Sequence, residues 1–124
     1  MIICIPMLPG RELNPNYKGH WSRRAKAARE LREVAGWRAK QERMRWLQGH
    51  EKAEVSVTFV IRDRRGYKDI DNAIASLKPA IDGCVDAGII PGDSDKHLSY
   101  RLPILYQIDK KRSPLTILEF KEIK

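Results

Sequence analysis

Residues 20–48 contain no proline and only one glycine, Gly36. Residue types that favour helices, chiefly Ala, Arg, Leu, Glu and Lys, dominate this stretch. The sequence therefore predicts either one long helix or two helices that bend near Gly36. A single helix of these residues would be about 43 Å long, at 1.5 Å per residue. Because such a helix needs a packing partner, the rest of the chain must supply a broad apolar surface.

Strands are the obvious source of that surface. Val55, Val57 and Phe59 alternate with polar residues, which is typical of a half-buried strand. Four segments have strand character: residues 1–8, 53–61, 98–108 and 115–123. The charged turn at 110–114 is expected to join the last two as a hairpin.

A second helix is predicted from Asp71 as N-cap to about Ala87, with Gly88 as the residue that ends it. Pro79 lies inside this segment and should kink it. Its expected core stripe, at spacings of three and four, is Ile74, Leu77, Ile81 and Val85. The predicted order of strand, helix, strand, helix, strand, strand indicates an α/β (α+β) fold. We expect one domain over residues 1–124, with a mixed sheet of about four strands, a long N-terminal helix and a second helix.

The charge of the chain is uneven. The net charge is +8, and residues 1–50 hold 11 Lys/Arg against 4 Asp/Glu, while residues 51–124 hold 13 against 12. Such asymmetry favours a nucleic acid or another anionic partner over a merely solubilising surface. No apolar run is long enough to span a membrane, so no membrane partner is expected.

Residues 1–8 lack the basic region and cleavage site of a signal peptide, so we expect them to form a first strand. Cys4 and Cys84 match no metal-site spacing. We expect both to be reduced, buried residues of a cytoplasmic protein.

The stretch Asp69-Ile70-Asp71-Asn72 follows the predicted strand 53–61 and opens the second helix. In an extended chain, positions i and i+2 face one side, so Asp69 and Asp71 could share a metal ion. Asp93, in a Pro-Gly turn after the helix, could return to the same end of the sheet. Mg²⁺ prefers oxygen ligands and binds substrate phosphate directly, which favours phosphodiester chemistry.

Two of these carboxylates also have an ordinary structural explanation. Aspartate is common at helix N-caps and in turns, and those two roles alone would account for Asp71 and Asp93. Lys78 lies two helical turns after Asp71, where it could contact the scissile phosphate or could simply be solvated. The residues by themselves leave both interpretations open.

Several motifs, in order, resemble the RusA family of Holliday-junction resolvases, especially its phage and prophage forms. They are Leu13-Asn-Pro-Asn16 with His20-Trp21, Asp69-Ile-Asp71-Asn72, Lys78-Pro-Ala-Ile-Asp82-Gly83, Asp86-Ala-Gly-Ile-Ile90 and Gly92-Asp93-Ser94. The resemblance implies a homodimeric, Mg²⁺-dependent endonuclease, with Mn²⁺ as a substitute, that nicks four-way DNA junctions in recombination and repair. It also implies a bacterial or phage-encoded protein.

Carried over residue by residue, Asp69, Asp71 and Asp93 match the metal-binding carboxylates and Lys78 matches the catalytic lysine. The chain departs from the family in two places. Five residues separate Asn72 from Lys78 where the common form has two, which moves the lysine about 4.5 Å along a helix. Gly92 replaces one residue of an acidic pair, and Asp95 is a candidate to compensate for it.

Basic residues near these motifs are the expected DNA contacts, because phosphates dominate sequence-independent binding. They are Arg23, Arg24, Lys26, Arg64, Arg65 and Lys68, and the neutral Asn16 is a further expected contact. Two rival functions remain: another nuclease of branched DNA, acting on flaps or forks, and a junction-binding protein of the same fold with little turnover.

Overall fold

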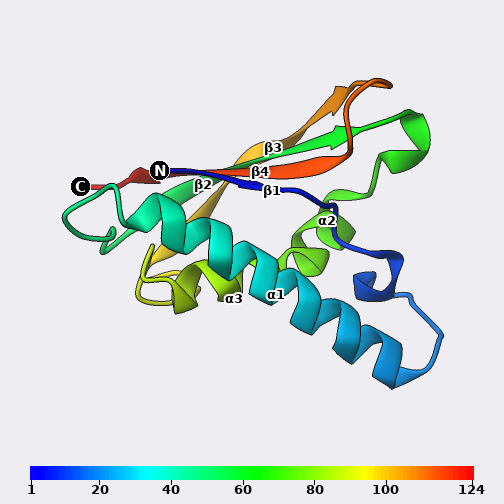
Figure 1. The fold of residues 1–124 in the computed structure, drawn as a ribbon, viewed down its shortest axis with the longest axis horizontal. Helices are drawn as coiled ribbons and strands as arrows, with labels where there is room; N and C mark the ends of the chain where they lie inside the picture. Colours follow the sequence, from blue (N-terminus) through cyan, green and yellow to red (C-terminus); the bar gives the residue numbers. More distant parts are fainter.

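The computed structural model describes residues 1–124 and contains one sheet with the three α-helices on one face (Figure 1). The sheet has four strands, β1 (Ile2–Ile5), β2 (Ala53–Ile61), β3 (Leu98–Ile108) and β4 (Leu115–Glu122). The order across the sheet is β1-β4-β2-β3. β2 pairs with β3 in parallel, whereas β4 is antiparallel to both β1 and β2. The predicted α+β class and the mixed four-stranded sheet are confirmed.

The predicted hairpin between the last two strands is wrong. β2 lies between β3 and β4, and the chain from 109 to 114 passes its end, where the Asp109 amide donates to the Ile61 carbonyl at 2.9 Å. Pro103 offers a physical reason for placing β3 at the edge, because proline has no amide hydrogen to donate to a neighbouring strand. The pairing of β2 with β3 also shifts register between Ser56 and Thr58.

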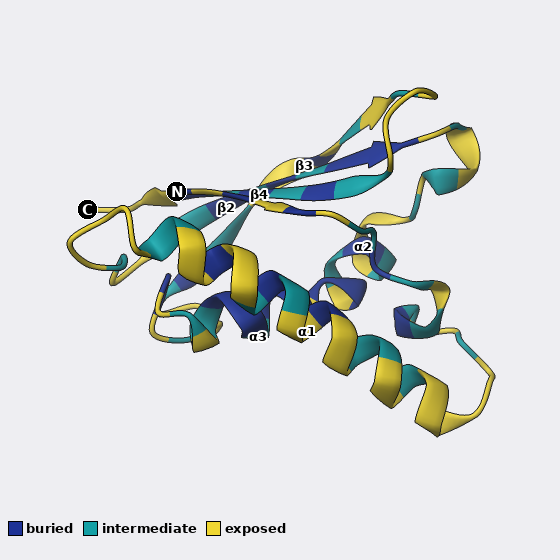
Figure 2. Cartoon of the chain, viewed as in Figure 1, coloured by how far each residue is buried: buried dark blue, intermediate teal, exposed yellow.

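The long helix α1 (Trp21–Arg43) runs through Gly36 without a break, so the one-helix alternative holds. His20 caps it, since the Ser22 amide donates to His20 Nδ1 at 3.1 Å. Its buried residues are Leu31 and the two small residues Ala35 and Ala39. They allow α1 to lie close to the sheet and to α3 (Lys78–Asp86), as Figure 2 shows by the buried strip between the layers.

The predicted second helix is two helices, α2 (Ile70–Ser76) and α3, separated at Leu77. The chain is broken rather than kinked because Pro79 has no amide to donate to residue 75 and its ring clashes with that carbonyl. The end at Gly88 is as predicted, with a positive φ of 83°. Leu77 and Ile81 are fully buried, which places the predicted stripe on the core side.

Cys84 is buried, as predicted, but Cys4 is exposed. Ile3 and Ile5 take the inward positions of β1, so the alternation of the strand turns Cys4 outward. The continuous apolar run at 2–5 conceals this alternation in the sequence. No helix in the structure combines the length and apolar character that crossing a membrane requires.

The two thiols should therefore differ in reactivity. Burial raises the pKa of the Cys84 thiol to about 12, so almost no thiolate is available there at pH 8. We expect a disulfide reagent to label one thiol per native chain rapidly and the second only on unfolding. Cys4→Ser should abolish the rapid phase, and two rapid equivalents in the wild type would contradict the buried position of Cys84.

Candidate functional site

Asp69 and Asp71 lie at the start of α2, and both are exposed. Asp69 is the N-cap, with an extended backbone (φ −60°, ψ 147°) and no capping hydrogen bond from its side chain. Asp71 lies in the first turn, and its Oδ1 accepts from the Asn72 amide at 3.0 Å. The prediction of Asp71 as N-cap is therefore wrong by two residues. The extended geometry assumed for the pair also ends at Asp69, because the helix starts at Ile70.

Neither carboxylate has a cation partner within the protein. The ion pairs of the structure involve other residues throughout. Exposed carboxylates without a basic partner are common on protein surfaces, but this chain has a net charge of +8 and therefore an excess of possible basic partners. Asp69 and Asp71 are free to accept an external cation.

Lys78, Asp82 and Asp93 form a second group, the Lys78 cluster. The Lys78 ammonium donates to Asp82 Oδ1 at 2.7 Å and to Asp93 Oδ2. Lys78 and Asp82 are one turn apart on α3, and Asp93 comes from the loop that leads to β3. The hydrogen bonds to Asp82 and Asp93 raise the pKa of Lys78, and the bond from Lys78 lowers the pKa of Asp93. The lysine is therefore protonated throughout the neutral range.

Tyr100 borders the Lys78 cluster from β3. Its register opposite the buried Val55 turns it toward the helices, where it packs against the core. Burial raises the pKa of Tyr100, and the nearby Asp93 charge adds to the effect. Asp82 could have been found from its i, i+4 spacing to Lys78. Tyr100 carries no such local signal, because only the sheet brings it to the cluster.

The structure does not gather the three predicted metal ligands. No three or more His, Cys, Asp or Glu side chains lie close enough together to hold a metal ion. Asp93 instead pairs with Lys78. Mg²⁺ nevertheless needs only one or two protein carboxylates, with water and substrate phosphate completing its shell. Asp69 and Asp71 supply that kind of donor, so the residues present fit a hard divalent cation.

The basic residues before α2 have different roles. Lys68 is half-buried, which lowers its pKa, and its ammonium donates to the Pro9 carbonyl at 3.4 Å. Arg65 pairs with Asp63 through two side-chain hydrogen bonds of 3.2 and 2.9 Å, which lower the pKa of Asp63 to about 2. Arg64 makes no ion pair and is exposed. Among the three predicted phosphate contacts, Arg64 is the one with no internal partner.

Of the predicted DNA contacts near the N-terminus, some have partners within the protein and others are exposed. Arg24 donates to the carbonyls of Glu12 at 3.1 Å and Asn14 at 2.7 Å, and lies over the Tyr17 ring. It therefore anchors the loop before α1. The Asn16 amide donates to Asn14 Oδ1 within that loop. Arg23 is exposed, and Lys26 is exposed but faces Glu30 at 3.9 Å.

Comparison with known proteins adds one relative without a described activity. An uncharacterized protein of Xylella fastidiosa strain Temecula1 is 34% identical over 83 residues, which cover 64% of this chain and 52% of that protein. The chain therefore spans about half the length of the curated relative it matches. No family model matches the chain.

Proposed function

We propose that this protein is a Mg²⁺-dependent endonuclease of the RusA type that nicks four-way DNA junctions as a homodimer in the cytoplasm. The observation that carries the proposal is the exposed pair Asp69 and Asp71, free of any protein cation, nine and seven residues before the protonated Lys78. The order of the surrounding motifs supports it. So does the basic balance of the chain, since branched DNA is bound mainly through phosphates.

In this proposal Asp69 and Asp71 hold the cation. Bound Mg²⁺ lowers the pKa of a coordinated water and stabilises charge on the phosphate. Lys78 supplies a fixed positive charge toward the pentacoordinate phosphate, and Asp82 and Asp93 hold the ammonium in position. Because the pKa of Lys78 is raised, it cannot serve as the proton acceptor at neutral pH. Two copies related by a two-fold axis would supply the paired sites that symmetric nicking needs.

One observation favours a second function, a junction-binding protein with little turnover. The Lys78 ammonium is already occupied by two carboxylates, and no third carboxylate joins Asp69 and Asp71. In such a protein the Lys78 cluster would be a structural tie between α3 and the loop before β3.

Cleavage of a synthetic four-way junction separates these functions. We expect paired, symmetric nicks with Mg²⁺ and none with EDTA, while binding persists in both. A gel shift without nicks under any divalent cation would favour the binding protein. Equal cleavage of flaps, forks or linear duplex would instead indicate a nuclease with a different DNA substrate.

A further inference from the structure

A row of cations follows the side of α1 that faces α3. Arg29, Arg32, Lys40 and Arg43 are spaced so that they share one helix face, with Gly36 between the second and third. Two contacts confirm that this face of α1 is turned toward α3. Arg32 donates to Asp86 on α3 at 2.7 and 2.8 Å, and Arg43 donates to the carbonyl of Gly88, just after α3, at 3.2 Å. Asp86 is the acidic residue that pairs with the row, and the charge of Asp82 also acts on Arg32.

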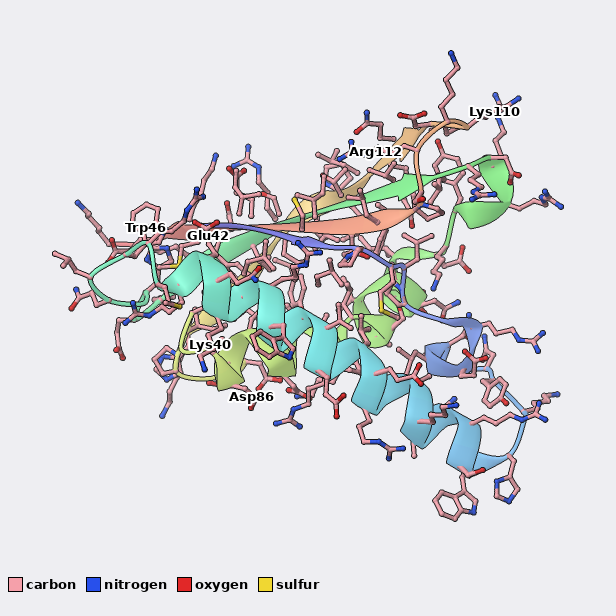
Figure 3. All side chains as sticks on the ribbon, in the orientation of Figure 1. Lys40, Glu42, Trp46, Asp86, Lys110 and Arg112 are labelled. Carbon is pink, nitrogen blue, oxygen red and sulfur yellow. The ribbon has the colours of Figure 1, made fainter.

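At the gap left by Gly36 the surface is hollowed. The hollow has a volume of about 240 Å³ and is lined by Gly36, Trp37, Lys40, Asp86 and Ala87. Trp37 is 69% exposed, and Met44, seven residues on and therefore on the same face, is 78% exposed. Lys40 and Asp86 come together here from two different helices (Figure 3). A large, exposed indole thus lies beside the cationic row.

The charges and the exposed indole of this surface favour a single-stranded nucleic acid as its partner. A row of cations tracks a phosphate backbone, and an open indole stacks on an unpaired base, the combination by which proteins hold single strands. Asp86 is kept ionised, because its hydrogen bonds from Arg32 lower its pKa. A carboxylate in the wall repels phosphate but accepts from a base amino group such as cytosine N4. A second copy of the chain would bring the same cations face to face.

We propose that α1 and α3 form a binding surface for single-stranded DNA, with an unpaired base in the hollow beside Trp37 and phosphates along the exposed Arg29 and Lys40. This surface lies at the end of α3 remote from Asp69 and Asp71. Asp69 and Asp71 lie at the start of α2, and neither lines the hollow at the end of α3, so the two places use different residues. The proposal stands without cleavage, since strand binding needs neither Asp69 nor a metal.

The test is a fluorescence titration with a 12-nucleotide oligo(dC) in EDTA. A chain with Trp21→Phe and Trp46→Phe reports on Trp37 alone. We expect oligo(dC) to quench its emission and a 12-base-pair duplex to leave it unchanged. In the otherwise wild-type chain, Trp37→Ala should weaken oligo(dC) binding about 5- to 100-fold. Trp21→Ala, which removes the exposed indole at the first residue of α1, should change the affinity for oligo(dC) less than twofold.

Three results would overturn the proposal. The first is an affinity of Trp37→Ala for oligo(dC) within twofold of wild type. The second is a greater loss of affinity for Trp21→Ala than for Trp37→Ala. The third is that Trp37→Ala disrupts a dimer of the chain but leaves its affinity for the oligonucleotide unchanged. Because Trp37 is exposed, circular dichroism should show the variants folded. Junction cleavage with Mg²⁺ is measured separately, so failure here leaves the proposed nuclease function intact.

Discussion

Replacing Gly83 by alanine is expected to destabilise the protein by about 2–3 kcal/mol, within the range for overpacking a tight interior. A Cβ at this position would stand 2.5 Å from the Arg32 carbonyl oxygen and 2.8 Å from the Gly36 amide nitrogen. Both obstacles are backbone atoms of α1, so no side chain can rotate to make room. The new methyl group must push α1 away from α3 and open the buried layer between them. Urea unfolding followed by circular dichroism measures the effect.

Gly36 supplies the matched control from the facing helix. A Cβ there would lie 3.6 Å from the Gly83 carbonyl oxygen, an ordinary contact. Since glycine costs about 0.5–1 kcal/mol relative to alanine inside a helix, Gly36→Ala should be neutral or slightly stabilising. The two substitutions add the same atom to opposite sides of one contact. Equal destabilisation by both would contradict the close approach of α1 and α3 at Gly83.

The elements that the sequence predicts best are those whose signals are local. The alternation of Val55, Val57 and Phe59 defines β2, and the absence of proline defines α1. Strand order is different, because it depends on which strand each neighbour pairs with across the sheet. The turn at 110–114 favours a hairpin locally, yet β2 takes β4 on one side and β3 on the other. Pro103 was the available hint that β3 lies at an edge.

In the candidate site, too, local spacing identifies some residues, whereas others depend on tertiary structure. Asp69 and Asp71 are found from their spacing after a strand, and Lys78 from its helical distance to them. The partners of Lys78 depend on tertiary structure, because the loop after α3 returns Asp93 to the lysine and not to Asp69 and Asp71. Sequence spacing places charged residues at one end of a sheet. The conformation of the loops then determines which oppositely charged residues form ion pairs.

Replacing Asp71 by asparagine is expected to reduce junction cleavage by a factor on the order of 10² or more, the usual loss when one electrostatic contributor to the reacting centre is removed. Asparagine keeps the shape of the side chain and its acceptor for the Asn72 amide, but it removes the charge that would hold the cation. Junction affinity should be unchanged or higher, because one negative charge facing DNA is lost. Single-turnover cleavage and a gel shift measure the two effects.

Glu33→Gln removes the same charge from an exposed residue of α1 that forms no ion pair, and it should cleave at the wild-type rate. Asp71 also lies in the first turn of α2, where a carboxylate interacts favourably with the helix dipole. Some stability, about 0.5 kcal/mol, should therefore be lost in Asp71→Asn alone. This cost is too small to unfold the chain, so a large loss of cleavage in a folded, junction-binding variant identifies Asp71 as part of the reacting centre. Cleavage within a few-fold of wild type would remove Asp71 from it.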